Sequence, residues 1–258
     1  MPHRLAALPA GAVVEREALA AFAETAAHLY ASEDLDETLR RITDVVQHSM
    51  PACAMASVSI IHGAEISTHA ATGAGALEAD RLQYAVGEGP CLAAALEHQL
   101  VYVPDTVVDD RWPAFTRQLA PMGLRGLLAC GFRSGDEPGR VTGALNLYAS
   151  VPDAFTEEDA AMALILAVHA GAIVHASLQQ QNLRAAIESR DVIGQAKGIV
   201  MERFKLTAEE AFARLRQSSQ ALNVKLRDLA ERVARTGDLP PEAPSLDGQR
   251  SRRAPGRT

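Results

Sequence analysis

Lysine is almost absent from this chain. Its 258 residues hold only three, Lys197, Lys205 and Lys225, and all three lie toward the C-terminal end. Residues 1–183 carry 10 arginines against 22 acidic residues, a net charge of −12, whereas residues 184–236 carry 11 basic against 7 acidic residues, a net charge of +4. An acidic body therefore precedes a basic segment, which is typical of a sensor joined to a nucleic-acid-binding output.

Cysteine is also scarce, with three residues at Cys53, Cys91 and Cys130. Neither these cysteines nor the histidines show the short spacings of metal ligands. An odd number of widely separated cysteines indicates reduced thiols and a cytoplasmic protein. We therefore expect no metal site and no cofactor, although a small-molecule effector remains compatible with the sequence.

Long apolar runs and phosphate-binding loops are missing as well. The N-terminal residues lack the apolar segment of a signal peptide. The stretch Ala160–Leu183 contains no charged residue, but its apolar part ends near Val174, short of the ~20 residues that a bilayer requires. We expect a buried or dimer-forming helix there and no membrane association. Gly87–Gly89 is not followed by the Lys-Ser/Thr pair of a P-loop.

The body of the chain alternates between helical spacing and strand spacing. Two strands around a turn at Gly63 predict a hairpin, and two more strands precede a long helix that Thr156 begins. We expect an α+β fold, in which an antiparallel sheet has flanking helices. The expected helices are 15–30, 34–50 (begun by Ser32 or Asp34), 77–84, 92–98, one starting at 109–115, and one after 156; the expected strands are 55–61, 66–71, 100–103, 126–132 and 141–148.

Five short motifs occur in a fixed order along this body. They are V-G-E-G-P-C (86–91), V-Y-V-P-D (101–105), D-R-W-P-A-F (110–115), G-A-L-N-L-Y (143–148) and A-F-T-E-E-D (154–159). Together they resemble a GAF domain over about residues 22–176, especially the GAF domains that precede ANTAR modules in actinobacterial regulators. The resemblance implies a ligand-sensing domain.

Cys91 is the most specific candidate for a functional residue in this domain. The GAF fold also serves an enzyme, the free methionine sulfoxide reductase, which has a cysteine at a similar place. That family's second reactive cysteine precedes the last two strands, where this chain reads Leu119–Arg125 without a thiol. Cys130 lies in an apolar strand, where a buried, inert thiol is usual. We therefore expect no enzyme activity and no catalytic residue, and Cys91 is a candidate for ligand sensing.

The segment Arg190–Arg203 has the spacing of a helix with two glycines in it. Gly194 and Gly198 each cost up to ~1 kcal/mol relative to alanine. Such a cost predicts that a neighbouring helix or a ligand backbone comes close there. Two further helices are expected, one begun by the capping box Thr207–Glu210 and one capped by Asn223 and ended by Gly237; the second of these precedes two prolines.

The string SRDVIGQAKGIVMERF and the two helices after it resemble an ANTAR domain, over residues 183 to about 236. That family consists of RNA-binding antitermination modules, and the resemblance implies a three-helix bundle at the end of a coiled coil that grips paired RNA hairpin loops as a dimer. Arg190 and Lys197 stand in the core string, and Ser218 accompanies Ser219 as a polar base reader. The candidate RNA-binding residues are Arg190, Lys197, Arg203, Lys205, Arg214, Ser219, Asn223, Lys225 and Arg227.

We therefore expect a cytoplasmic, homodimeric antitermination regulator whose GAF sensor controls an ANTAR output bound to the hairpins of nascent transcripts. The alternatives are a sensor whose helical end docks a protein partner, and a DNA-binding regulator. A dimer seam is expected through Ile173, Ala176, Gln180, Leu183 and Ile187. The expected parts are a tail (1–14), the sensor (15–176), the coiled-coil linker with the output domain (177–236), and a disordered tail (237–258).

Overall fold

The computed structural model describes residues 34–135 and 141–240. The chain divides into two compact units, residues 1–179 and residues 180–258. The predicted helix 15–30, the predicted tail 1–14 and most of the predicted tail 237–258 lie outside the described residues. Each unit is presented by itself.

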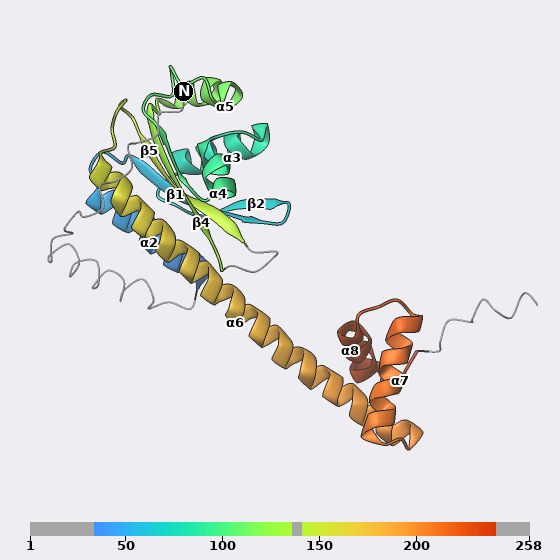
Figure 1. Ribbon diagram of the computed structural model, residues 1–258. Coiled ribbons are helices and arrows are strands. Elements are labelled where there is room, and N and C mark those ends of the chain that lie inside the picture. The colour runs from blue at the N-terminus through green and yellow to red at the C-terminus, as the bar shows by residue number, and fades with distance from the viewer. Residues whose placement is uncertain (1–33, 136–140, 241–258) are drawn as a thin grey trace, which may run out of the picture. The chain divides into compact units, whose positions relative to one another are not determined.

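A five-stranded antiparallel sheet forms the centre of the first unit (Figure 1). The order of its strands is β2-β1-β5-β4-β3, and every neighbouring pair is antiparallel. This confirms the predicted fold class, including the hairpin, whose turn contains Gly63 at a φ of 63°. The strands are β1 (Met55–His62), β2 (Glu65–Ala71), β3 (Leu100–Val103), β4 (Gly126–Arg133) and β5 (Thr142–Ala149).

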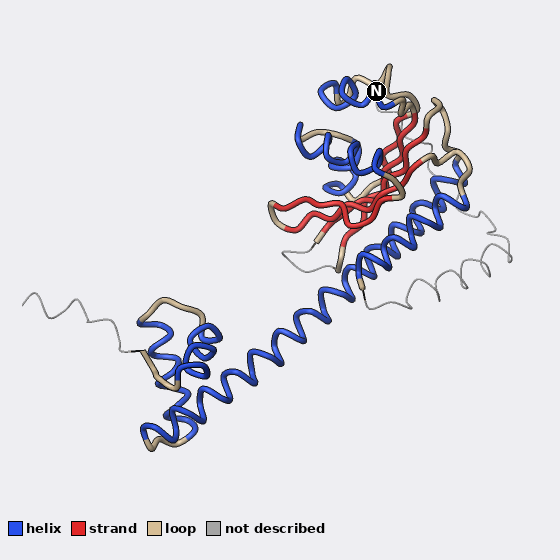
Figure 2. Tube along the Cα trace, turned by 180° about the vertical axis from the view of Figure 1, so that it is seen from behind, coloured by secondary structure: helices blue, strands red, loops and turns tan. Residues whose placement is uncertain are grey.

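Helix α2 (Leu35–Ser49) and the first part of α6 (Glu157–Phe204) cover one face of the sheet (Figure 2). Asp34 begins α2, because its carboxylate accepts the backbone N–H groups of the next turn. Leu39 and Ile42 of α2 and Leu166 of α6 have no exposed surface. Burial of each such side chain contributes about 1.5–3 kcal/mol. The alternate residues of β1, β4 and β5 complete this core.

Three shorter helices cover the other face of the sheet: α3 (Ala74–Val86), α4 (Pro90–Glu97) and α5 (Pro113–Leu119), with a 3₁₀ turn (Ala120–Met122) after α5. The backbone of α4 lies directly on β4. A Cβ atom added at Gly131 would lie 1.9 Å from the carbonyl oxygen of Ala94. Glycine at this position therefore allows the close approach that encloses the space between α4 and the sheet.

The second unit is built from the C-terminal part of α6 with α7 (Ala208–Ala221) and α8 (Leu226–Thr236). Thr207 begins α7 through the predicted capping box: its hydroxyl accepts the N–H of Glu210, whose carboxylate accepts the N–H of Thr207. α8 ends at Gly237, which has a φ of 75°. Within the described residues, the hydrophobic core of this unit contains no aromatic residue; its buried members are Ala196, Val200, Ala211, Leu215, Leu229, Ala230 and Val233.

The predicted role of Asn223 as the cap of the third helix was wrong. Lys225 is the residue that precedes α8, and its side chain makes no capping hydrogen bond. Asn223 instead lies in the turn after α7 with a φ of 52°. Asparagine tolerates this left-handed conformation better than most residues, so it allows the chain to turn between the two helices.

By length and composition alone, α6 could cross a membrane. Its apolar run has a place within the first unit, however, because Ala163, Leu166, Ala170 and Val174 are buried against the sheet. A core helix accounts for these side chains, which is one of the two roles that the sequence predicted.

Candidate functional site

Polar side chains gather in the interior of the first unit, between the sheet and helices α3 and α4. Asp80 of α3 is fully buried at their centre. One of its carboxylate oxygens accepts the hydroxyl of Tyr148 at 2.5 Å and the amide of Asn146 at 3.2 Å, and the other accepts the hydroxyl of Thr68 at 2.8 Å. We name this group the polar cluster; its members are Ser57, Ser59, Thr68, Asp80, Tyr84, Asn146 and Tyr148.

Asp80 makes no ion pair with any residue in the described ranges. Burial raises the pKa of its carboxyl above the ordinary value, and the hydrogen bonds from Tyr148 and its neighbours oppose that rise. Burial and the nearby Asp80 carboxyl likewise raise the pKa of the Tyr148 hydroxyl. The oxygen Oδ1 of Asn146 is buried and has no hydrogen-bond partner in the described part of the chain. The cluster thus holds a carboxyl group without a cation and one unused acceptor.

Cys91 borders the polar cluster at the start of α4. Its Sγ lies 3.3 Å from the amide nitrogen of Asn146, and its backbone N–H donates to Oε1 of Gln83 at 2.8 Å. Burial, followed by the nearby Asp80 carboxyl, raises the pKa of this thiol to about 12. A thiol of this kind is protonated at neutral pH and is a poor nucleophile.

The fold requires glycine at position 89, in the glycine-rich string before Cys91. Gly89 has a φ of 148°, and a Cβ atom there would lie 2.3 Å from Oε1 of Gln83. Cys130 is also buried, in β4, and burial raises the pKa of its thiol to about 12. Neither thiol has the exposed, electropositive surroundings that activate a cysteine.

The two helix glycines of the second unit face open space. A Cβ atom at Gly194 or Gly198 would meet no atom within 4 Å, so the expected neighbouring helix is not found among the described residues. Arg190 and Lys197 lie seven residues apart on the same side of α6, and no described residue forms an ion pair with either. Gly194, Gly198, Arg190 and Lys197 therefore form a surface of α6 that we name the glycine face.

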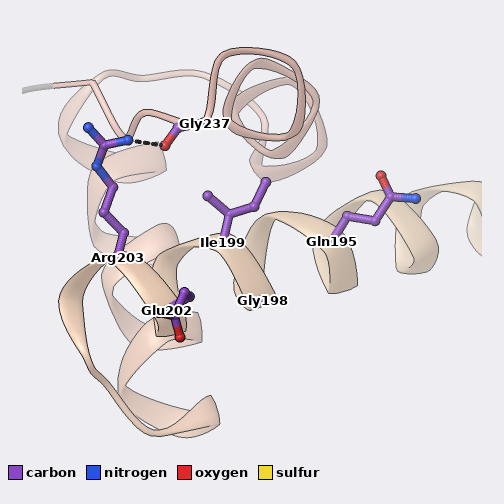
Figure 3. Close-up of a pocket in the computed structure, with 6 residues that line it drawn as sticks. All are labelled: Gln195, Gly198, Ile199, Glu202, Arg203 and Gly237. Atoms are coloured by element: carbon purple, nitrogen blue, oxygen red, sulfur yellow. Dashed lines mark hydrogen bonds between the residues drawn. The ribbon is translucent and has the colours of Figure 1, made fainter.

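Other candidate cations are already engaged within the second unit. Arg203 donates to the carbonyl oxygen of Gly237 at 2.8 Å (Figure 3). It also pairs with Asp238 at 2.5 Å. Arg227 pairs with Glu231 of its own helix and with Glu188 of α6. These contacts hold the ends of α8 to α6.

A shallow hollow lies beside the contact of Arg203, as Figure 3 shows. It is lined by Gln195, Gly198, Ile199, Glu202, Arg203 and Gly237.

The remaining candidates differ in their surroundings. Lys205 pairs with Glu202. Arg214 lies over the ring of Phe204, and Lys225 is exposed at the start of α8.

The predicted polar base readers lie at the end of α7. Ser219 is 8% exposed, and its hydroxyl donates to the carbonyl oxygen of Val224 at 2.7 Å. Ser218 is also buried. Asn223 is exposed in the turn that follows. The structure therefore places Arg190 and Lys197 on the same side of α6 and buries both serines.

No group of three or more metal-ligating side chains occurs within residues 34–135 and 141–240. Sequence reasoning missed the polar cluster, although a signal for it is present. Ser57 and Ser59 alternate with apolar residues in β1, and Asn146 and Tyr148 do the same in β5. Period-two polar residues on two strands indicate one polar sheet face.

Two family models match the chain. The model of the GAF domain matches residues 32–175, which is more than half of the chain, and that of the ANTAR domain matches residues 181–233. The chain belongs to the GAF domain family and carries an ANTAR domain behind its GAF domain. The two matches lie on either side of the boundary between the compact units, at residues 179 and 180. This GAF–ANTAR architecture is that of a regulatory protein.

Solved structures share the fold of the GAF domain. The GAF domain from a phosphoenolpyruvate-protein phosphotransferase of Coxiella burnetii is 19% identical, with a TM-score of 0.49 over 64% of this chain and 96% of that one. A bacteriophytochrome of R. palustris is 11% identical, with a TM-score of 0.52 over 82% of this chain and 48% of that one. The free methionine-R-sulfoxide reductase of Neisseria meningitidis, in complex with its substrate, is 15% identical, with a TM-score of 0.47 over 62% of this chain and 88% of that one. None of the curated proteins matches the GAF–ANTAR chain.

Proposed function

We propose that this GAF–ANTAR protein is a cytoplasmic transcription antitermination regulator, in which the GAF sensor controls an ANTAR output that binds tandem RNA hairpins. The glycine face is the observation that carries the proposal. Its exposed backbone lets a phosphate chain approach α6, and Arg190 and Lys197 supply charge that no described carboxylate neutralises. An anionic polymer with splayed loop bases suits this surface.

The sensor has no activated group for catalysis among the described thiols. Cys91 and Cys130 are buried, and the pKa of each is raised to about 12. Reductase chemistry needs a reactive thiolate, so the family likeness to a reductase does not extend to these sites. A sensing role for the polar cluster and Cys91 is the better-supported reading of this domain.

The proposal includes a homodimer formed through α6. Val168, Leu183 and Ile187 are 69%, 64% and 55% exposed, and Ile165 is exposed as well. Ile165 and Val168 lie three residues apart within the first unit, and Leu183 and Ile187 lie four residues apart within the second, so each pair is on one side of its own part of α6. The seam expected through Ile173 needs correction, because Ile173 is packed in the core of the first unit. A second copy is the partner that an exposed apolar stripe with this spacing suits.

The experiment measures binding of the full chain to a tandem-hairpin RNA, selected from a pool with randomised loops, and to duplex DNA of matched length. Lys197→Ala should weaken RNA binding and reduce its salt dependence by about one counterion. Lys205→Ala is the comparison: this candidate already pairs with Glu202, so its loss should weaken RNA binding less than the loss of Lys197. Thermal melts of Lys197→Ala should hold or rise, because alanine is a good helix former.

The outcomes separate the alternatives. Two chains per tandem-hairpin RNA are expected by light scattering, and a strict monomer with one hairpin would refute the dimer. Tighter binding to duplex DNA would favour the DNA-binding alternative. A wild-type chain that binds neither nucleic acid would overturn the proposed function, and unchanged affinity in folded Lys197→Ala would remove that lysine from the site.

A further inference from the structure

The aromatic residues of the second unit are placed unlike those of the first. Within the described residues, Phe204 and Phe212 are 37% and 40% exposed, whereas every described aromatic side chain of the first unit is buried or half-buried. The hydrophobic core of the second unit contains no aromatic residue among the described ranges. Single exposed apolar side chains are common on protein surfaces, so the contacts that each of these two rings makes decide its role.

Arg214 of α7 lies over one of these two rings. The central carbon of its guanidinium is 4.3 Å from the centroid of the Phe204 ring, at the C-terminal end of α6. This cation–π contact holds the guanidinium over the ring. Arg214 as a whole is exposed to solvent.

The charge of Arg214 is not neutralised by its natural partner on the helix. Glu210 lies four residues earlier, at the spacing of a helical ion pair. Its carboxylate is instead turned back to the N–H and hydroxyl of Thr207 in the capping box, both at 2.8 Å. These hydrogen bonds lower the pKa of Glu210 and keep the group at the helix terminus. No described carboxylate forms an ion pair with Arg214.

We propose that Arg214, stacked on Phe204, is a platform for one unpaired base of the RNA loop. This inference rests on the proposed function and adds a base-recognising contact at the corner between α6 and α7. A splayed base stacks on aromatic rings and on arginine planes, and the guanidinium edge can donate to a phosphate or to the base. A solvated cation such as Lys225 would supply charge but no stacking surface.

The test uses the full-length protein and the tandem-hairpin RNA selected by the wild-type chain. Phe204→Leu keeps an apolar side chain, and Arg214→Lys keeps the charge; each removes one part of the stack. Each should weaken RNA binding roughly 5- to 100-fold. Arg214→Lys should do so with little change in the salt dependence. Phe212→Leu is the matched control, because Phe212 is equally exposed but lies on the other side of the buried stripe of α7.

A second series replaces each loop nucleotide by an abasic one. At the contacted position, the abasic RNA should bind wild type and Phe204→Leu alike, since the two changes remove the same contact. Equal affinity of wild type, Phe204→Leu and Arg214→Lys for the intact RNA would overturn the platform and leave the proposed function standing. Absence of RNA binding by wild type would overturn both. If Phe204→Leu fails to fold by circular dichroism, Arg214→Lys and the abasic series decide.

Discussion

Replacing Asp80 by asparagine should stabilise the GAF domain, and the gain should increase with pH. Asparagine has nearly the same shape, and its amide can still accept from Tyr148 and donate to the hydroxyl oxygens nearby. The substitution removes the ionisable carboxyl, which is fully buried and pairs with no described cation. One acceptor is lost with it, which offsets about 1 kcal/mol of the gain.

The magnitude follows from proton linkage. Burial raises the pKa of the folded Asp80 carboxyl above the value of 3.8 for the free side chain. Between these two pKa values the folded chain binds more protons than the unfolded chain, so the stability of wild type falls as the pH rises. The loss grows by at most about 1.4 kcal/mol per pH unit between the two pKa values, and it vanishes near pH 3.8. The Asp80→Asn protein does not lose this stability, because asparagine does not ionise.

Urea titrations at pH 5, 6 and 7 measure the effect. Trp112 is the only tryptophan of the chain and lies half-buried in the first unit, so its fluorescence reports on the GAF domain and not on the ANTAR domain. Ionisable groups other than Asp80 contribute equally to the stability of wild type and of Asp80→Asn, so their contributions cancel in the difference between the two proteins. A difference in stability that stays constant or shrinks from pH 5 to pH 7 would refute the reasoning, because it would mean that Asp80 is ionised and held by its donors.

Two further predictions concern the thiols and the contact of Arg203. The thiols of Cys53, Cys91 and Cys130 should react with Ellman's reagent only on unfolding, since burial raises their pKa values to about 11, 12 and 12. Rapid reaction of the native chain would contradict this prediction, as would turnover of methionine sulfoxide. Arg203→Ala should lower the stability of the ANTAR unit by ~1 kcal/mol, because the ion pair that it removes is exposed to solvent; a melt followed by circular dichroism that shows no change would show that the contact adds nothing.

The elements that the sequence predicted best are those with local signals. The hairpin around Gly63 and the capping box of Thr207 depend on residues a few positions apart, and both are present in the structure. The polar cluster depends on a pairing that no local pattern specifies. Asn146 contacts Ser57, 89 positions away, through the register of β1 and β5.

The same distinction holds for the candidate RNA-binding residues. The core string contains both Arg190 and Lys197, and in the structure they lie on the same side of α6. The contact of Arg203 with Gly237, 34 residues later, depends on the ending of α8 and has no signature in the local sequence. The error at Asn223 has a related cause, since asparagine is favoured both before a helix and in a left-handed turn.

A count of basic residues therefore overstates the charge that an RNA would meet on this domain. Arg203, Lys205 and Arg227 each pair with a carboxylate of their own unit. Releasing such a pair to contact a phosphate exchanges one ionic contact for another and gains little. The cations of the glycine face and the stacked Arg214 have no such contact to lose. The net charge of +4 is modest for a nucleic-acid-binding segment, but Arg190 and Lys197 lie on the side of α6 where the glycines expose the backbone.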